Sequence, residues 1–239
     1  YLKLIKSRET FFNKSKIKKW SENKSTYKND PIFMVGFPRS GTTLLDTILR
    51  SHPQIDVIEE KPLVYKIVGD LNKLTNGNFE SLKDINDDEI DEIRNNYFTM
   101  RKTFLDEKSD AKLIIDKMPL NIIYIGEILR VFPNAKFIVS LRHPCDCVLS
   151  CFMQNFALND SMANFLNLED SAKFYDAVMK LWITYSSSLS FQFYILKYEN
   201  LVKKFENSLQ EVLNFLNIEW SDSLIEFYKT AERRGLIST

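Results

Sequence analysis

The sequence is poor in cysteine, and its three cysteines, Cys145, Cys147 and Cys151, all lie in one short segment. A disulfide framework is therefore not expected. The chain has only two histidines, and one of them, His143, adjoins this segment. A zinc site there is one interpretation, but Cys147 and Cys151 have helical spacing within an apolar run, which favours buried free thiols. We predict no metal site.

The chain also lacks a long apolar segment and a net charge. No apolar run approaches the roughly 20 residues of a membrane span, and no secretory signal precedes the first predicted strand. These absences, with the cysteine usage, favour a cytoplasmic location. Lys plus Arg and Asp plus Glu number 32 each, so no overall field would recruit nucleic acid or an anionic membrane. Any anion-binding site must be local.

The length and composition are compatible with one large domain. The 239 residues are 44% hydrophobic and 13% aromatic, which is enough for a substantial single core. Residues 2–20 have a basic, helical apolar pattern, and the polar run 21–30 is typical of a linker. We therefore divide the chain into an amino-terminal helix and linker at residues 1–30 and a main domain at residues 31–239.

The stretch PIFMVGFPRSGTT at residues 31–43 is predicted to bind an oxyanion. Residues 31–35 form an apolar run typical of a buried strand, and the apolar residues after the stretch have helical spacing. Between them the chain must turn sharply. The first N–H groups of a helix have no intrahelical partners and lie at the positive end of its dipole, so they can hold a phosphate group. Arg39 adds a planar charged fork. Hydroxyls come from Ser40, Thr42 and Thr43.

This loop has the outer frame of a P-loop but lacks its lysine. Four residues separate Gly36 from Gly41, whereas Thr42 stands where the motif GxxxxGK[ST] needs Lys. One alternative is a P-loop kinase or triphosphatase, because residues 112–116 imitate a strand that ends in a metal-binding Asp. The missing lysine argues against it. Another alternative is an ordinary turn in which Arg39 is a surface residue, and the concentration of Gly, Arg, Ser and Thr in one loop argues against that.

Strand and helix patterns alternate along the chain. The predicted strands are 31–35, 113–116, 135–141 and 191–196, and the predicted helices are 42–51, most of 61–108, 121–131, 144–156 and 171–189. This alternation indicates a P-loop-like three-layer α/β/α fold, with helices on both faces of a central parallel sheet. Ligands of such folds bind at the carboxyl ends of the strands, so motifs that follow strands should converge.

Four predicted strand ends carry polar groups. Besides the loop, they are Asp116–Lys117, Arg142–His143 and residues 197–199. Arg142 together with Ser150, on the first turns of the next helix, would form a second anion site. The alternative is a surface arginine in a salt bridge. Two phosphate-sized sites on one sheet edge predict a ligand with phosphate groups at both ends.

Several motifs occur together in one order along residues 31–228. They are VGFPRSGTTLL, SHPQIDVIEE, DKMPLN, FPNAKFIVSLRHPCDCVLSCFMQNF and LKYENLV. This set resembles the sulfotransferases that use 3′-phosphoadenosine 5′-phosphosulfate (PAPS), and it looks most similar to bacterial sulfotransferases that carry tetratricopeptide repeats and to tyrosylprotein sulfotransferases. The resemblance implies PAPS as the donor, adenosine 3′,5′-bisphosphate (PAP) as the product, a hydroxyl-bearing acceptor and no metal.

The resemblance also implies which residues bind the nucleotide. Arg142 and Ser150 would bind the 3′-phosphate, and Tyr198 matches a tyrosine near the nucleotide. The 5′-phosphosulfate cradle would consist of Arg39, Ser40, Gly41, Thr42 and Thr43.

Catalytic roles are implied in the same way. Glu60 matches the catalytic base of the tyrosylprotein enzymes, and Lys117 matches a lysine in their Asn-Lys-Asp-Pro motif. Sulfuryl transfer needs an in-line nucleophile, a base and cations at the leaving oxygen. We expect Glu60 to take the acceptor proton while Lys117 and Arg39 stabilise the developing charge. The alternatives are that Glu59 and Glu60 are exposed acids at a loop edge and that Lys117 pairs only with Asp116.

The sequence also departs from the family pattern. His143 stands where the family often has Asp, and Pro62 replaces an arginine that the tyrosylprotein enzymes use for their acidic peptide, so a protein-tyrosine acceptor is not implied. The chain begins with Tyr1 and ends at Thr239, about where related enzymes enter a loop that closes over the nucleotide. We expect truncation at both ends, with repeats missing on the amino side. A catalytically silent nucleotide-binding domain and a homodimer are left open.

Overall fold

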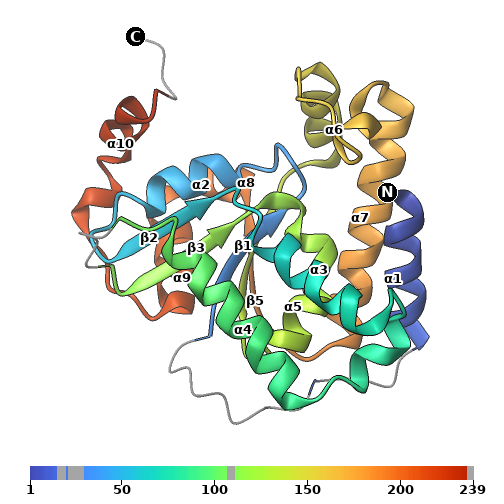
Figure 1. Cartoon of the computed structure of the whole chain (residues 1–239). Coiled ribbons are helices and arrows are strands. Elements are labelled where there is room, and N and C mark those ends of the chain that lie inside the picture. Colours follow the sequence, from blue (N-terminus) through green and yellow to red (C-terminus); the bar gives the residue numbers. More distant parts are fainter. Residues whose placement is uncertain (15–19, 21–29, 107–110, 236–239) are drawn as a thin grey trace.

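In the computed structural model, which describes residues 1–14, 20, 30–106 and 111–235, five strands form one parallel sheet (Figure 1). The strands are β1 (Ile32–Gly36), β2 (Ile55–Glu59), β3 (Leu113–Lys117), β4 (Lys136–Leu141) and β5 (Gln192–Lys197). Their order across the sheet is β2-β3-β1-β4-β5, and each neighbouring pair is parallel. All five strands therefore end at the same edge of the sheet.

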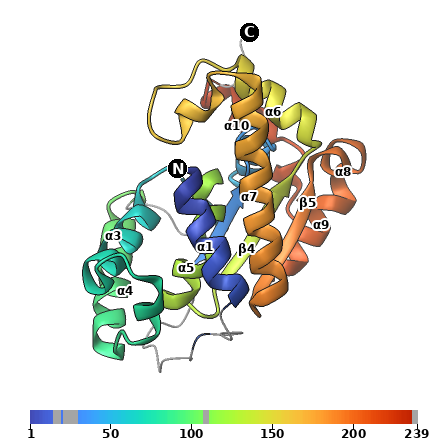
Figure 2. The ribbon, with the colours of Figure 1, turned by 90° about the vertical axis from the view of Figure 1, so that its right-hand side faces the viewer.

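Helices cover both faces of this sheet (Figures 1 and 2). They are α1 (Leu2–Lys14), α2 (Thr42–Leu49), α3 (Leu63–Thr75), α4 (Asp87–Lys102), α5 (Ile125–Val131), α6 (Pro144–Met153), α7 (Leu168–Ser188), α8 (Tyr198–Lys203), α9 (Phe205–Leu216) and α10 (Phe227–Arg233). A short 3-10 helix, η2 (Pro119–Tyr124), leads from β3 into α5. Within the described ranges, none of these helices is both long enough and apolar enough to cross a membrane.

Alternation along the strands divides the core into two parts. Phe33 and Val35 of β1 point to the face covered by α1, α3, α4, α5 and α7, whereas Ile32 and Met34 point to the face covered by α2, α8 and α9. Successive side chains of a strand lie on opposite faces of a sheet, so a strand buried on both sides is apolar at every position. The predicted three-layer α/β/α fold is confirmed.

The edge strand β2 was not among the predicted strands. It is only five residues long; Ile55, Val57 and Ile58 are buried, and Asp56 and Glu59 are half-exposed. The alternation of apolar and polar residues at Ile55, Asp56 and Val57 was the available signal. This strand is important because it delivers Glu59 and Glu60 to the same sheet edge as the loop after β1.

Helix α1 shares the larger part of the core. It packs beside α7 (Figure 2), and its Ile5 and Phe12 are each 1% exposed. The Phe12 ring lies so close to Gly126 of α5 that a Cβ there would come within 2.1 Å of it. The predicted linker, residues 21–30, falls almost entirely outside the described residues, and the division of the chain at residue 30 stays a prediction.

Candidate functional site

The loop after β1 is held in an unusual backbone conformation against β4. Arg39 has a φ of 69° and Gly41, the residue before α2, has a φ of 96°. The Ser140 hydroxyl of β4 donates a hydrogen bond to the Ser40 carbonyl at 3.3 Å. A Cβ at Gly36 would lie 2.6 Å from the Ser140 carbonyl oxygen, so only glycine lets the loop leave the strand here. These contacts fix the path of the loop into the amino terminus of α2.

The interior of this loop offers an unused polar group. Ser40 is 1% exposed, and its Oγ atom makes no hydrogen bond within the described residues. The α2 amino terminus receives no side-chain cap, so its first N–H groups remain available. A buried hydroxyl without a partner costs free energy unless a ligand satisfies it. The loop therefore has the properties of an oxyanion site.

An aromatic ring connects this loop to the end of β4. A Cβ on Gly41 would lie 2.5 Å from Cδ2 of Tyr198, at the start of α8. On the same ring, the Arg142 guanidinium carbon lies 4.7 Å from the centroid, in cation–π geometry. Gly41, Tyr198 and Arg142 thus form one packed group from three separate segments of the chain.

This packing predicts that Gly41→Ala lowers the free energy of unfolding by about 1–3 kcal/mol, because the new methyl group meets Tyr198 and the residue must keep a left-handed φ. Gly69→Ala in α3 is the matched control, since a Cβ there meets nothing within 4 Å. We expect the control to be neutral or slightly stabilising. Urea unfolding of both variants measures this, and equal stabilities would contradict the close approach.

The two predicted anion-binding groups meet on one rim. Arg39 is exposed, and its Nε donates a hydrogen bond to Ser150 Oγ of α6 at 3.0 Å. Arg142 Nη1 donates to the Arg39 carbonyl at 3.4 Å, and Arg142 Nη2 pairs with Asp146 at 3.2 Å. The Nε atom of Arg142 is buried and has no partner within the described residues. Arg142 therefore makes the salt bridge of the alternative interpretation, and it also has a buried donor without a partner among the described residues.

An acid–lysine cluster occupies the ends of β2 and β3. The Lys117 side chain is 0% exposed, and its Nζ donates to Glu59 Oε1 at 3.0 Å and to Glu60 Oε1 at 2.8 Å. Glu60 N also donates to the Lys117 carbonyl at 2.7 Å. A buried ammonium needs anionic partners, so this lysine binds both glutamates rather than the adjacent Asp116.

The two glutamates differ in how firmly they are held. Burial opposes ionisation of the Glu59 carboxyl, but hydrogen bonds and charges from Lys117 and Arg234 outweigh it and lower the pKa of Glu59. The Glu60 side chain is 53% exposed, against 36% for Glu59. Arg234 was not among the predicted site residues; it donates to Glu59 from the carboxyl-terminal end of the described chain.

Backbone strain coincides with these predicted residues. In the described part of the chain, four non-glycine residues have positive φ: Arg39, Glu60, Asn76 and Asn217. The two asparagines end helices α3 and α9, where a left-handed residue is common. Arg39, in the loop after β1, and Glu60, directly after β2, have φ of 69° and 51° and lie at no helix end. Strained residues away from helix ends gather at functional sites, which supports both as members of this one.

The two buried cysteines pack beneath the site, where the Cys151 thiol donates to the Pro38 carbonyl at 3.4 Å, and Asp116 faces away from it. Cys147 and Cys151 are buried and Cys145 is exposed, and all three are free thiols. Asp116 is 1% exposed and accepts a hydrogen bond from Tyr97 of α4 at 3.2 Å. Its carboxylate thus faces α4 instead of the loop, which disfavours the kinase alternative because that function needs Asp116 beside the phosphates.

The buried Asp116 carboxyl predicts a pH-dependent stability. Burial raises its pKa from 3.8 to about 7, so between these values the folded state binds a proton that the unfolded state has released. Stability should therefore fall as the pH rises from about 4 to about 7. Asp116→Asn removes this fall and is expected to be more stable than the parent at pH 8. Thermal melts across this range measure it, with the exposed Asp84→Asn as a control that should retain the parent profile.

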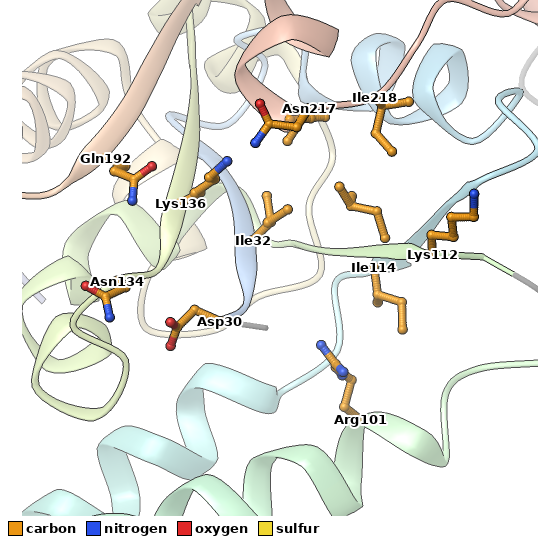
Figure 3. A pocket seen from close by; sticks show the side chains of 12 residues that line it. Asp30, Ile32, Arg101, Lys112, Ile114, Asn134, Lys136, Gln192, Asn217 and Ile218 are labelled. Carbon is orange, nitrogen blue, oxygen red and sulfur yellow. The ribbon is translucent and has the colours of Figure 1, made fainter. Parts of the chain in front are cut away.

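A separate cavity of about 530 Å³ lies at the opposite edge of the sheet (Figure 3). Three cationic residues line it, but Lys136 donates to the Phe215 carbonyl at 3.0 Å and Arg101 lies over the Phe98 ring. None of the predicted site residues lines this cavity. It lies at the amino ends of the strands, whereas ligands of open parallel sheets bind at the carboxyl ends.

Comparison with known proteins places the chain in a family. A model of the sulfotransferase family matches residues 31–222, and the chain belongs to that family. It is 33% identical over 210 residues to an uncharacterized protein of Aquifex aeolicus, covering 84% of this chain and 27% of that protein. It is 24% identical over 218 residues to protein-tyrosine sulfotransferase 2 of Gallus gallus, covering 87% and 56%. The chain thus spans about a quarter and just over half of these two relatives.

Solved structures share the fold. The sulfotransferase domain of the curacin biosynthetic pathway aligns with a TM-score of 0.54 at 21% identity, covering 85% of this chain and 79% of that one. Sulfotransferase STF9 of Mycobacterium avium aligns with a TM-score of 0.53 at 14% identity, covering 87% and 69%. The family and the fold agree with the resemblance in the sequence motifs.

Proposed function

We propose that the protein transfers a sulfuryl group from PAPS to a hydroxyl group of an acceptor. The observation that carries this proposal is the arrangement at one sheet edge, where the loop after β1, Arg142 with Ser150, and the cluster of Lys117 with its two glutamates lie together. Family membership supports sulfuryl transfer in general. The donor, the base and the acceptor are part of the proposal.

The anion-binding groups would hold the two ends of the donor. The loop from Arg39 to Thr43 would hold the 5′-phosphosulfate, with the α2 amino terminus and the unpaired Ser40 hydroxyl as donors. Arg142 and Ser150 would hold the 3′-phosphate through the free Arg142 Nε and the Ser150 hydroxyl, while Tyr198 lies between the loop and Arg142. Arg39 now contacts Ser150, so donor binding would replace this contact by oxygens of the ligand.

Glu60 is the proposed base. An acceptor oxygen attacks the sulfur, its proton passes to Glu60, and the bond between sulfur and the 5′-phosphate oxygen breaks with its electron pair on the departing PAP. Lys117 holds Glu60 Oε1, and Oε2 makes no hydrogen bond within the described residues, so this oxygen can face an acceptor. Lys117 and Arg39 would stabilise the charge on the sulfuryl group and the leaving phosphate.

The acceptor is proposed only as a hydroxyl-bearing molecule. Some relatives are named protein-tyrosine sulfotransferases, but the resemblance puts Pro62 at the place of an arginine that those enzymes use for their acidic peptide. Pro62 is exposed at the start of α3, two residues after Glu60. A neutral residue there gives no attraction for an acidic peptide, so the acceptor is expected to differ from that of the tyrosylprotein enzymes.

Two measurements test the proposal. Calorimetric titration with PAP and, separately, with ATP plus Mg²⁺ should show binding of PAP only. Incubation with ³⁵S-labelled PAPS and a panel of sugars, lipids, phenols, small alcohols and peptides should then label one acceptor class. Binding of ATP–Mg²⁺ instead of PAP would overturn the proposal in favour of a kinase or triphosphatase. Binding of PAP without transfer to any acceptor would favour a catalytically silent nucleotide-binding domain.

A further inference from the structure

Arg234, just after α10, reaches into the candidate site from the carboxyl-terminal side. Its Nη1 donates to Thr47 Oγ1 at 2.6 Å, and its Nη2 donates to Asp46 Oδ2 at 3.0 Å and also to Glu59 Oε2. The Arg234 side chain is 17% exposed. One guanidinium therefore joins the end of α10 to helix α2 and to the end of strand β2.

Glu59 is consequently held at both of its oxygens. Lys117 donates to Oε1 and Arg234 donates to Oε2. Each cation also has a second acid: Lys117 contacts Glu60, and Arg234 contacts Asp46, whose side chain is 0% exposed. Glu59 thus links Lys117 of β3 to Arg234, which lies 175 residues after Glu59 in the chain.

The same arginine is connected to the helix of the anion loop. Asp46 and Thr47 belong to α2, and Thr47 Oγ1 donates to the Thr43 carbonyl in the first turn of that helix at 2.8 Å. Helix α10 also contacts the end of α2, where the Ser51 and Thr230 hydroxyls are 3.0 Å apart. Helix α10 packs next to α2, as Figure 1 shows.

We propose that Arg234 is a positioning residue that fixes Glu59, so that Lys117 is held at the sheet edge and orients Glu60 through its Oε1 atom, with Glu60 Oε2 left for the acceptor proton. This inference rests on the proposed function for the role of Glu60. Without Arg234, Glu59 would keep one cation, and it would compete with Glu60 for Lys117. The charged groups that face Glu59 are Lys117, Arg234 and Asp46, with Glu60 as its neighbour in the chain.

Carboxyl titration by NMR tests the contact without relying on activity. In protein labelled with ¹³C at the glutamate carboxyl, the Glu59 signal is identified by its loss in Glu59→Gln. Arg234→Ala should raise the pKa of Glu59, because one of two cations is removed. Arg233→Ala is the matched control, since Arg233 is exposed and adjacent, and it should leave the Glu59 titration unchanged. An unchanged titration in Arg234→Ala would overturn the proposal.

Kinetics then test the positioning role. Arg234→Ala should lower kcat about tenfold and shift the acidic limb of the pH–rate profile to higher pH. The KM for PAPS should change little. Arg234→Lys should restore part of the rate. In a Glu59→Gln background the Arg234→Ala effect should largely disappear, because the two residues act in series. If the losses of kcat caused by Arg234→Ala and Glu59→Gln simply add in the double variant, Arg234 does not act through Glu59, and the positioning role is overturned.

The titration and the kinetic measurements together distinguish a failure of this inference from a failure of the proposed function. If no acceptor is labelled by any variant, the proposed function fails, while the titration still shows whether Arg234 fixes Glu59. If transfer occurs and Arg234→Ala retains both rate and pH profile, only the positioning role fails. Should Arg234→Ala not fold, because buried Asp46 loses a counter-ion, Arg234→Gln removes the charge but keeps an amide donor, and the same shifts in the Glu59 titration and in the rate are expected.

Discussion

Glu60→Gln is expected to lower kcat for sulfuryl transfer by about two to four orders of magnitude, the usual contribution of a positioned general base. Glutamine keeps the size of the side chain and can still accept a hydrogen bond from Lys117, but it cannot take the acceptor proton. The KM for PAPS and the affinity for PAP should change little, because the proposed nucleotide ligands lie on the other strand ends. Steady-state kinetics with the labelled acceptor and titration with PAP measure both quantities.

Glu59→Gln is the matched comparison for this substitution. Both glutamates contact the same Lys117 Nζ, at 3.0 and 2.8 Å, so a purely electrostatic effect on the lysine would appear in both variants. A base role would appear only in Glu60→Gln, as a loss of rate together with loss of the acidic limb of the pH profile. Full turnover in Glu60→Gln would refute the assignment of the base, and a larger loss in Glu59→Gln would transfer that role to its neighbour.

The local parts of the site were predictable from the sequence. The strand and helix around Gly36–Thr43 have clear apolar periodicities, and the chemistry of Gly, Arg, Ser and Thr in one loop is itself local. The position of Lys117 at a strand end followed from a β3 pattern that the structure confirms. Once a parallel sheet is assumed, topology alone brings such strand ends to one edge.

Other features depend on tertiary contacts that a sequence pattern does not contain. The strand β2 is short and lies at the edge, so its pattern is weak, although it carries Glu59 and Glu60. The contact between Glu59 and Arg234 joins residues 175 positions apart. The positive φ values of Arg39 and Glu60 arise because surrounding contacts impose them, and neither residue type favours that conformation. Strain and long-range ion pairs therefore had to come from the structure.

Arg142→Ala is expected to weaken PAP binding by about 10- to 100-fold, which corresponds to the loss of a charge-assisted hydrogen bond to phosphate. The same variant should bind adenosine 5′-monophosphate as the parent does, because that nucleotide has no 3′-phosphate. The expected selectivity follows from the free Nε of Arg142, which is buried and lacks a partner within the described residues. Titration of both nucleotides against both proteins measures it.

The comparison of the two nucleotides separates a 3′-phosphate contact from the other roles of Arg142. Its guanidinium also lies over the Tyr198 ring and pairs with Asp146, so a general disturbance of the rim would weaken both nucleotides equally. Lys203→Ala in α8 removes a positive charge from an exposed position. It is the control for a general loss of positive charge, which should change the affinity for PAP only weakly because salt screens exposed charges. Unchanged PAP affinity in Arg142→Ala would show that the 3′-phosphate binds elsewhere, and the loop after β1 would then be the sole anion site supported at this edge.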